Sequence, residues 1–393
     1  MNRHLLIILI TVVLASSSRV LASDSTTVHE SIPDSSAVQK KPNFFTKILN
    51  YFSDSNKEHT NKKFDFSIIG GPHYSSDTQF GIGLVAAGLY RQNRADTLIQ
   101  PSNVSLYGDI STVGFYLIGI RGTHIFPSDR FRINYKLFFY SFPTYFWGIG
   151  YRNGRDNEDK TSYKRLQSQA KVDFLVQLAP SLFIGPTASF QYIDAKQVPN
   201  EHRELWQGQD LHTTNVSMGL QLTYDTRDVM SNAYSGMFIS AEQQFYPRFL
   251  GNKQYNFSST ELTANGYTTL WRGGVLATQL HARFTYGHTP WGMLSTLGGS
   301  ESMRGYYEGR YRDMNAIDAT VELRQNVYRR SGIALWVGAG NVFSSHSPFS
   351  WSHTLPNYGI GYRWEFKHRV NVRLDYGFGL HTSAFVFSIN EAF

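Results

Sequence analysis

Few residues of this 393-residue chain stand in a pattern that could support catalysis. The sequence has no cysteine, which rules out thiol nucleophiles, zinc–thiolate sites and disulfide bonds. Its 13 histidines and its many serines form no nucleophile motif, and the outward Ser–His–Asn set that a membrane phospholipase needs is not evident. His281 falls instead on the predicted inward face of a strand. We therefore expect no enzyme activity, no cofactor and no metal site.

Two short motifs that could bind a ligand have simpler interpretations. Asp156-Asn157-Glu158-Asp159 could hold a cation, but its pattern is more typical of a solvated acidic loop. Gly81 and Gly83 are not followed by the start of a helix, which a phosphate-binding turn requires. The net charge of +7 is modest, and no dense run of lysine and arginine is interleaved with aromatic residues. Nucleic acid is therefore not an expected partner.

Most of the chain alternates between apolar and polar residues, as β-strands do when their two faces meet different environments. Val370, Val372 and Leu374, for example, alternate with Asn371 and Arg373. The predicted strands run to about 10 residues, against five or six in most soluble proteins, and about 10 residues suffice to cross a bilayer at a tilt. The repeated pattern predicts strands that cross a membrane rather than a soluble sandwich.

The composition supports the same fold class. Aromatic residues make up 15% of the chain and charged residues only 17%, yet the mean hydropathy is −0.32. After the N-terminus no run of about 18 apolar residues occurs, which excludes a helical membrane protein. We predict an all-β fold, a transmembrane antiparallel β-barrel over residues 63–393, because lipid-facing and lumen-facing residues average to mild polarity in such a barrel.

The number of strands follows from a count of the alternating segments. About 17 candidates lie between Phe64 and Phe393, whereas bacterial single-chain barrels have even numbers of strands. Two short candidates abut between Ser102 and Ile120, so we expect one of them to be false or both to be halves of one strand. We therefore predict 16 strands. The connection from about Gly287 to Asp318 is far longer than a hairpin loop, and such loops are usually functional or disordered.

The N-terminal segment indicates export. Residues 1–22 resemble a signal peptide, with an apolar core from Leu5 to Ala15 that is too short to span a bilayer and a small-residue cleavage site at Val20-Leu21-Ala22. Residues 23–62 form a polar leader. Within that leader, residues 43–53 carry apolar side chains at helical spacing and predict a short amphipathic helix.

The long connection near the end contains a motif that resembles a known family. Arg304-Gly305-Tyr306 resembles the Arg-Gly-aromatic motif on the sixth extracellular loop of the BamA/TamA superfamily, the outer-membrane assembly and surface-antigen barrels. This resemblance implies a loop that folds back into the lumen, where the arginine pairs with acidic residues of the next strands. Glu322 matches the family's inward glutamate, and alternation independently places it in the lumen. The pair would serve as a lock or gate, or only as a structural tether.

The sequence departs from the family pattern on the following strand. Gly338 stands where the family's aromatic-x-Asp-x-Gly segment has its aspartate. We therefore expect the loop to be held less firmly than in the family, or to be held by Asp375 instead.

Both ends of the predicted barrel carry further expectations from the resemblance. Phe385, Phe387, Ile389 and Phe393 fall on one face of the last strand and resemble the C-terminal signal read by outer-membrane assembly machinery, although Glu391 occupies a position that is often aromatic. The first and last strands form a weak seam in family members. The residues that the first strand would contribute to the seam are Phe64, Phe66, Gly70 and Gly71.

The resemblance implies a function in the outer membrane of a Gram-negative-type bacterium. Periplasmic POTRA domains need about 75 residues each in this family, and residues 23–62 are too few for one, so the chain resembles a short branch without them. We expect it to assist the assembly or export of outer-membrane proteins. Its expected partners are outer-membrane lipid and proteins of the envelope, either assembly-complex members or client barrels. The alternatives are a passive channel or porin and a structural surface-antigen barrel.

Overall fold

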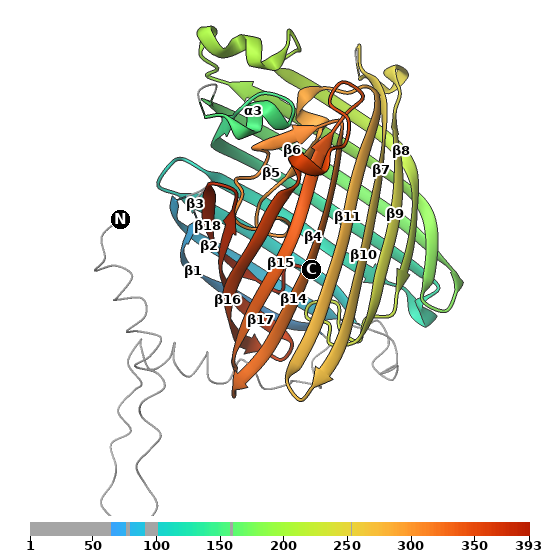
Figure 1. The fold of residues 1–393 in the computed structure, drawn as a ribbon. Coiled ribbons are helices and arrows are strands. Elements are labelled where there is room, and N and C mark those ends of the chain that lie inside the picture. The colour runs from blue at the N-terminus through green and yellow to red at the C-terminus, as the bar shows by residue number, and fades with distance from the viewer. Residues whose placement is uncertain (1–63, 76–78, 91–100, 158–159, 253) are drawn as a thin grey trace, which may run out of the picture. The chain divides into compact units, whose positions relative to one another are not determined.

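The computed structural model describes residues 64–75, 79–90, 101–157, 160–252 and 254–393. Sixteen strands form one antiparallel sheet in which each strand pairs with the next one along the chain (Figure 1). The strands are β1 (Phe64–Ser75), β2 (Gln79–Tyr90), β3 (Ser102–Ser111), β4 (Tyr116–Ile125), β5 (Phe131–Phe146), β6 (Thr161–Ala179), β7 (Leu182–Lys196), β8 (His212–Asp225), β9 (Gly236–Tyr246), β10 (Asn256–Trp271), β11 (Gly274–His288), β14 (Asn315–Tyr328), β15 (Ser331–Phe343), β16 (Leu355–Lys367), β17 (Val370–Gly379) and β18 (Thr382–Ile389).

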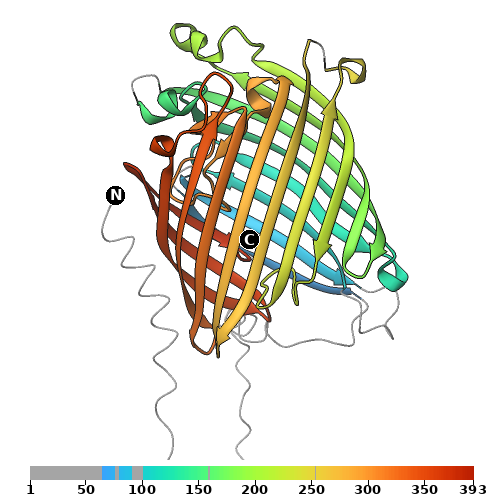
Figure 2. The ribbon, with the colours of Figure 1, turned by 45° about the vertical axis from the view of Figure 1, so that its right-hand side comes forward.

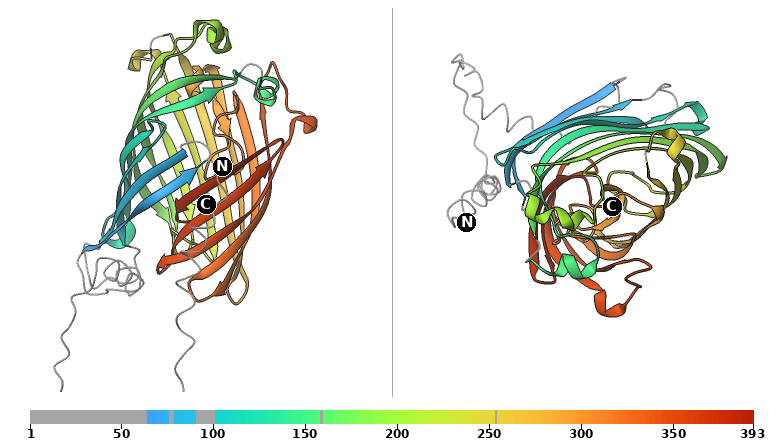
Figure 3. Two further views of the ribbon diagram at one scale, coloured as in Figure 1. Left: turned by 90° about the vertical axis from the view of Figure 1, so that its left-hand side faces the viewer. Right: turned by 90° about the horizontal axis from the view of Figure 1, so that it is seen from above.

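The sheet curls into a barrel, as the turned views show (Figures 2 and 3). The predicted all-β barrel of 16 strands is therefore confirmed. The interpretation of the Ser102–Ile120 stretch is wrong, because β3 and β4 are both complete strands. They looked like halves because only the four residues 112–115 separate them, including Gly114 with a φ of +80° that lets the chain reverse tightly.

The two faces of the barrel wall differ as the alternation predicts. On β14 the side chain of Val321 points outward and is 44% exposed, whereas Thr320, Glu322 and Arg324 point inward and are buried. Cross-strand partners share a face, so this inward and outward division continues around the sheet. The apolar face is therefore the outer one and the buried polar side chains line the lumen, which is the arrangement of a barrel in lipid.

The connections differ between the two ends of the barrel. Long connections follow the odd-numbered strands β5, β7, β9 and β11, and we call their end the loop end. The connections that follow the even-numbered strands lie at the other end, which we call the turn end. The loops carry the helix α3 (Tyr151–Arg155), the 3-10 helices η2 (Asn200–Trp206) and η4 (Trp291–Met293), and the two-stranded sheet of β12 (Ser295–Leu297) and β13 (Tyr311–Asp313).

An aromatic cluster packs the loops together at the loop end. Trp206 and Trp291 are completely buried and pack edge-to-face at 5.9 Å, and Phe146 stacks on Trp206 at 4.3 Å. This cluster anchors η2 and η4 to the end of β5, so the connection between β11 and β14 starts from a fixed position.

The edge strands of the sheet are β1 and β18, which approach each other at the seam (Figure 3). β1 pairs with β2 from Phe64 to Ser75, and β18, with eight residues, is the shortest of the sixteen strands. The pairings of the described residues include none between β1 and β18 themselves.

Within the described ranges, no helix has the length and apolar character needed to cross a membrane. The predicted signal peptide, the polar leader and the helix over residues 43–53 lie outside the described residues and remain predictions.

Candidate functional site in the barrel lumen

The connection from β11 to β14 enters the lumen between its own two short strands. β12 and β13 pair from Ser295–Asp313 to Leu297–Tyr311 and close the neck of a loop over residues 298–310. At its tip Gly305 has a φ of +120°, and a Cβ there would lie 2.7 Å from the main-chain carbon of Gly377. Only glycine permits both this backbone conformation and this approach to the barrel wall. We call residues 298–310 the inserted loop.

Arg304 of the inserted loop binds two carboxylates from different strands. Its Nη1 donates to Asp375 Oδ2 at 2.7 Å, and its Nη2 donates to Glu322. Its guanidinium also lies 3.8 Å from the ring centre of Trp336. The side chain is 1% exposed, so the loop is attached to β14, β15 and β17 by one buried cation.

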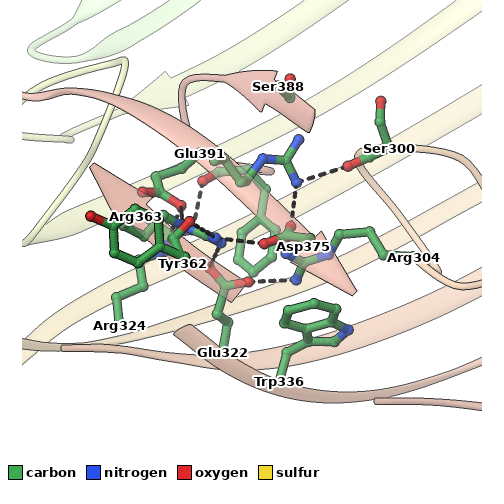
Figure 4. Close-up of polar contacts among 12 residues, drawn as sticks. Ser300, Arg304, Glu322, Arg324, Trp336, Tyr362, Arg363, Asp375, Ser388 and Glu391 are labelled. Atoms are coloured by element: carbon green, nitrogen blue, oxygen red, sulfur yellow. Dashed lines mark hydrogen bonds and ion pairs between the residues drawn. The ribbon is translucent and has the colours of Figure 1, made fainter. Parts of the chain in front are cut away.

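Further arginines from the barrel wall complete this arrangement (Figure 4). Arg363 Nη1 donates to Asp375 at 2.5 Å and Arg363 Nε donates to Glu391 at 2.8 Å, while Arg324 Nε donates to Glu322 at 2.7 Å. Each buried charge therefore faces at least one opposite charge, as burial requires. We call the set the lumenal ion cluster, and its members are Arg304, Glu322, Arg324, Arg363, Arg373, Asp375 and Glu391.

Hydrogen bonds to the main chain hold the loop on the wall as well. Asn357 Nδ2 donates to the main-chain oxygen of Arg304, and Asn357 Oδ1 accepts from Trp336 Nε1 at 3.1 Å. The Tyr306 hydroxyl donates to the oxygen of Pro356 and accepts from the nitrogen of Leu380, both at 2.7 Å. These bonds fix the loop's position independently of its charge.

Glycines of β16 and β17 make room for these contacts. A side chain at Gly377 would collide with the main chain of Arg304, and one at Gly379 would collide with the ring of Tyr306. A side chain at Gly361 would collide with Asp375 and Arg363. The wall next to the seam therefore forms a shallow groove that receives the tip of the loop. We call this the glycine groove.

The structure brings together most of the residues that the resemblance singled out. Arg304, Gly305 and Tyr306 lie on the inserted loop, and Glu322 and Asp375 both bind Arg304. Asp375 supplies the second carboxylate in place of Gly338. An aspartate at position 338 would not fit without movement, because its Cβ would lie 2.6 Å from the carbonyl oxygen of Ala319.

The residues assigned to the seam lie apart from this cluster. Phe64, Phe66, Gly70 and Gly71 are all on β1, where they pair with residues of β2. A Cβ at Gly70 would lie 2.6 Å from the oxygen of Gly83, whereas one at Gly71 would meet nothing. The predicted role of these residues in a labile seam stays a prediction.

The expectation that Phe393 shares the outward face of the last strand is wrong. Phe385, Phe387 and Ile389 do alternate with the buried Ala384 and Val386. The strand ends at Ile389, however, and a left-handed turn at Asn390, with a φ of +70°, breaks the alternation.

The chain after Asn390 turns into the lumen instead. Glu391 joins Arg363 and Arg324 in the lumenal ion cluster, and its Oε1 accepts from Asn371 at 2.7 Å. Arg324 Nη2 donates to the main-chain oxygen of Phe393 at 3.1 Å. The Phe393 side chain packs with the inward residues Ala233, Tyr267 and Ala277. The unusual acidic residue near the end of the sequence is thus a ligand of lumenal arginines.

Sequence reasoning missed several members of this site. Arg363 and Arg373 were not predicted, nor were Trp336 and Asn357. One signal was available for Arg373, which precedes Asp375 by two residues and therefore shares its inward face.

A second group of contacts lies at the turn end. Arg369, between β16 and β17, binds the carboxylate of Asp228, between β8 and β9, and its guanidinium lies 3.4 Å from the ring centre of Tyr234. Ser231 Oγ donates to the oxygen of Arg369 at 2.9 Å. Partial burial raises the pKa of Asp228, but the N–H of Tyr234 and the guanidinium of Arg369 outweigh it and lower the pKa below its ordinary value of 3.8. We call this group the turn-end contact.

A single antiparallel barrel with a loop held inside its lumen by a buried arginine defines a class of outer-membrane barrel. Residues 123–393 match the Omp85 superfamily domain, which is more than half of the chain. The chain therefore belongs to the Omp85 superfamily, as an outer-membrane β-barrel of that type.

Solved structures show the same fold. BamA from Haemophilus ducreyi lacking POTRA domains 1–3 superposes with a TM-score of 0.55 at 12% identity, over 82% of this chain and 70% of that chain. CdiB from Acinetobacter baumannii gives 0.51 at 12% identity, over 84% and 60%. CdiB from Escherichia coli gives 0.52 at 12% identity, over 83% and 62%. The chain thus spans about three fifths of the CdiB proteins' length. No curated protein matches the sequence.

Proposed function

We propose that this barrel assists the assembly or export of other outer-membrane proteins, with the seam between β1 and β18 as the place where a client strand pairs. The observation that carries the proposal is the inserted loop, which Arg304 fastens to Glu322 and Asp375. Proposed partners are outer-membrane lipid and envelope proteins, either client barrels or members of an assembly complex.

The position of the loop supports a barrel whose two sides differ in stiffness. The inserted loop binds β14, β15, β16 and β17, which form the wall leading up to β18. This side is held by buried ion pairs and hydrogen bonds. In the other half of the barrel the loop contacts β5, where the Tyr307 hydroxyl lies 2.9 Å from Thr144 Oγ1, but the contacts described do not join it to β1 or β2 at the seam.

The edge strands at the seam offer the chemistry that strand pairing needs. An edge strand presents a row of N–H and C=O groups that can pair with another chain. Among the described residues no strand pairing joins β18 to β1, so no ladder of hydrogen bonds would have to break between them. A client strand could therefore replace the β1–β18 contact at modest cost.

Depletion in cells tests the proposal directly. We expect loss of the protein to lower the levels of at least one other outer-membrane protein, and re-expression to restore them. The matched comparison is re-expression of Arg304→Ala against Arg272→Ala, since Arg272 is exposed in the turn between β10 and β11. Unchanged levels of every other outer-membrane protein after depletion would refute the proposal.

A disulfide across the seam tests where the client pairs. The chain has no cysteine, so a pair placed in β1 and β18 forms a single defined bond. We expect the oxidised barrel to lose its assembly function and to regain it on reduction. Full function with the seam closed would exclude the seam as the pairing site.

Two other functions make different predictions. A passive channel would give large, stable currents in planar bilayers, which the buried loop argues against. A structural surface-antigen barrel would give neither such currents nor any change in other outer-membrane proteins when depleted.

A further inference from the structure

Three cationic residues lie side by side on neighbouring strands of the N-terminal half of the barrel. Arg121 on β4 is the direct cross-strand partner of Lys136 on β5, and Lys136 is the direct partner of Lys171 on β6. Directly opposite residues have their Cβ atoms about 5 Å apart. We call these three residues the cationic row.

The row points into the lumen. Lys171 Nζ binds Glu242 of β9, three strands away, which is possible only through the interior. Because cross-strand partners share a face, Lys136 and Arg121 point inward with it. Ile118, Leu137 and Val172, which point to the opposite face of the same strands, are all apolar and more than 40% exposed. This agrees with an inward direction for the row.

Two members of the row lack an anionic partner. Lys171 is neutralised by Glu242 and lies 3.8 Å from Asp173. Among the described residues, Arg121 and Lys136 make no ion pair or hydrogen bond. Arg121 lies 5.7 Å from the ring centre of Tyr107, and Lys136 lies 5.3 Å from that of Phe138. Two carboxylates, Glu261 and Glu301, act on Lys136 only at longer range.

This arrangement contrasts with the other side of the lumen. In the lumenal ion cluster every arginine binds a carboxylate, and the groups are buried. In the row, like charges stand directly opposite each other, which destabilises a sheet. The side chains of Arg121 and Lys136 are nevertheless exposed, so water reaches them inside the barrel. The row is therefore a hydrated surface on which no direct ion pair among the described residues neutralises Arg121 or Lys136.

We propose that the cationic row lines a path for small inorganic anions between the inserted loop and the wall of β4, β5 and β6. Fixed charge on a low-dielectric wall concentrates counter-ions and excludes ions of its own sign. This inference goes beyond the proposed assembly function and does not depend on it.

Reversal potentials in a KCl gradient test the path. The purified full-length barrel is placed in planar bilayers, and we expect small currents that carry chloride in preference to potassium. Lys136→Glu and Arg121→Glu should each lower the chloride preference, and the double variant should reverse it. Arg272→Glu makes the same charge change on an exposed turn outside the row and should leave the preference unchanged.

The fold of the variants is checked by their heat resistance. Lys136→Glu places a carboxylate between Arg121 and Lys171, so it should keep or raise the melting temperature while it lowers the chloride preference. A loss of selectivity therefore cannot be attributed to unfolding. The proposal is overturned if the wild-type barrel passes no current, if it prefers potassium, or if neither charge reversal in the row changes the preference.

Discussion

Arg304 shows how one residue type decides whether the inserted loop can be held. Its planar guanidinium presents separate N–H groups to Glu322 and Asp375, which come from different strands, while its face rests on Trp336. A lysine carries the same charge but only a single ammonium group, which cannot fill this fork. The loop's attachment is therefore a matter of geometry as well as of charge.

Replacing Arg304 should weaken the barrel in a graded way. Arg304→Ala removes one of the cations that bind Glu322 and Asp375, while the arginines of the barrel wall remain. We expect a loss of about 3 kcal/mol in the free energy of unfolding. Arg304→Lys should lose about half as much, because one charged hydrogen bond can be kept. Urea unfolding in lipid vesicles measures both. Arg272→Ala should stay within about 0.5 kcal/mol of the wild type. If Arg272→Ala lost as much stability as Arg304→Ala, the effect would not be specific to Arg304.

Asp228 makes the turn-end contact sensitive to acid. Its pKa is lowered in the folded state, so its contribution to stability is present above its ordinary pKa of 3.8 and disappears as the pH falls below that value. Asp228→Asn should therefore be less stable than the wild type at pH 7, and the difference should be smaller at pH 3. Denaturant midpoints at the two pH values measure this. A difference that does not change with pH would show that the charge of Asp228 is not involved.

Individual site residues could be predicted where they lie in an alternating strand or in a known motif. Glu322 could be placed in the lumen because it lies within an unbroken strand, and Arg304 because it stands in a recognisable tripeptide. Glu391 could not, because the turn at Asn390 reverses the face on which the following residues lie. A positive φ at a residue other than glycine leaves little trace in a sequence.

The strands β16 and β17 act together as the surface that receives the loop. The glycine groove exists because Gly361, Gly377 and Gly379 lack side chains. The main chain of Arg304, the ring of Tyr306 and the ion pair of Arg363 with Asp375 fill the space. Not every glycine of the barrel makes room for a neighbouring group. A Cβ at Gly108 of β3, for example, would make only an ordinary contact of 3.6 Å.

Filling the glycine groove should expel the loop without touching any charge. Gly377→Ala places a methyl group against the main chain of Arg304, and we expect a loss of about 1–3 kcal/mol together with faster protease cleavage within residues 298–310. Gly108→Ala is the matched control and should change neither. Equal protease resistance in the two variants would mean that the loop does not need the groove.

The strands themselves were the most predictable elements, since lipid outside and a polar lumen inside impose a period of two along each of them. The boundary between β3 and β4 was misjudged because a four-residue turn leaves no polar gap that a pattern can detect. The contents of the lumen were less predictable, because pairing across a barrel joins strands that are distant in the sequence.

Across the whole molecule, one set of charges joins the inserted loop to the end of the last strand. Glu322 binds both Arg304 and Arg324, and Arg324 and Arg363 both bind Glu391. The loop tip and the residues after β18 therefore share partners. A change at one of them should alter the environment of the other.

A double-mutant cycle measures this coupling. Arg304→Ala and Glu391→Gln should have effects on the free energy of unfolding that differ from their sum by about 0.5–3 kcal/mol, since residues of one ionic network are not independent. Arg272→Ala combined with Glu391→Gln should be additive. Additivity in both pairs would show that the loop and the strand end are held separately.

The inserted loop also has a consequence for the order of events during biogenesis. Its tip is buried between strands that stand on both sides of it, and Arg304 reaches β14 and β17 at once. We infer that a loop attached in this way docks before β18 reaches β1, so that a segment outside the wall helps to align the strands that close it.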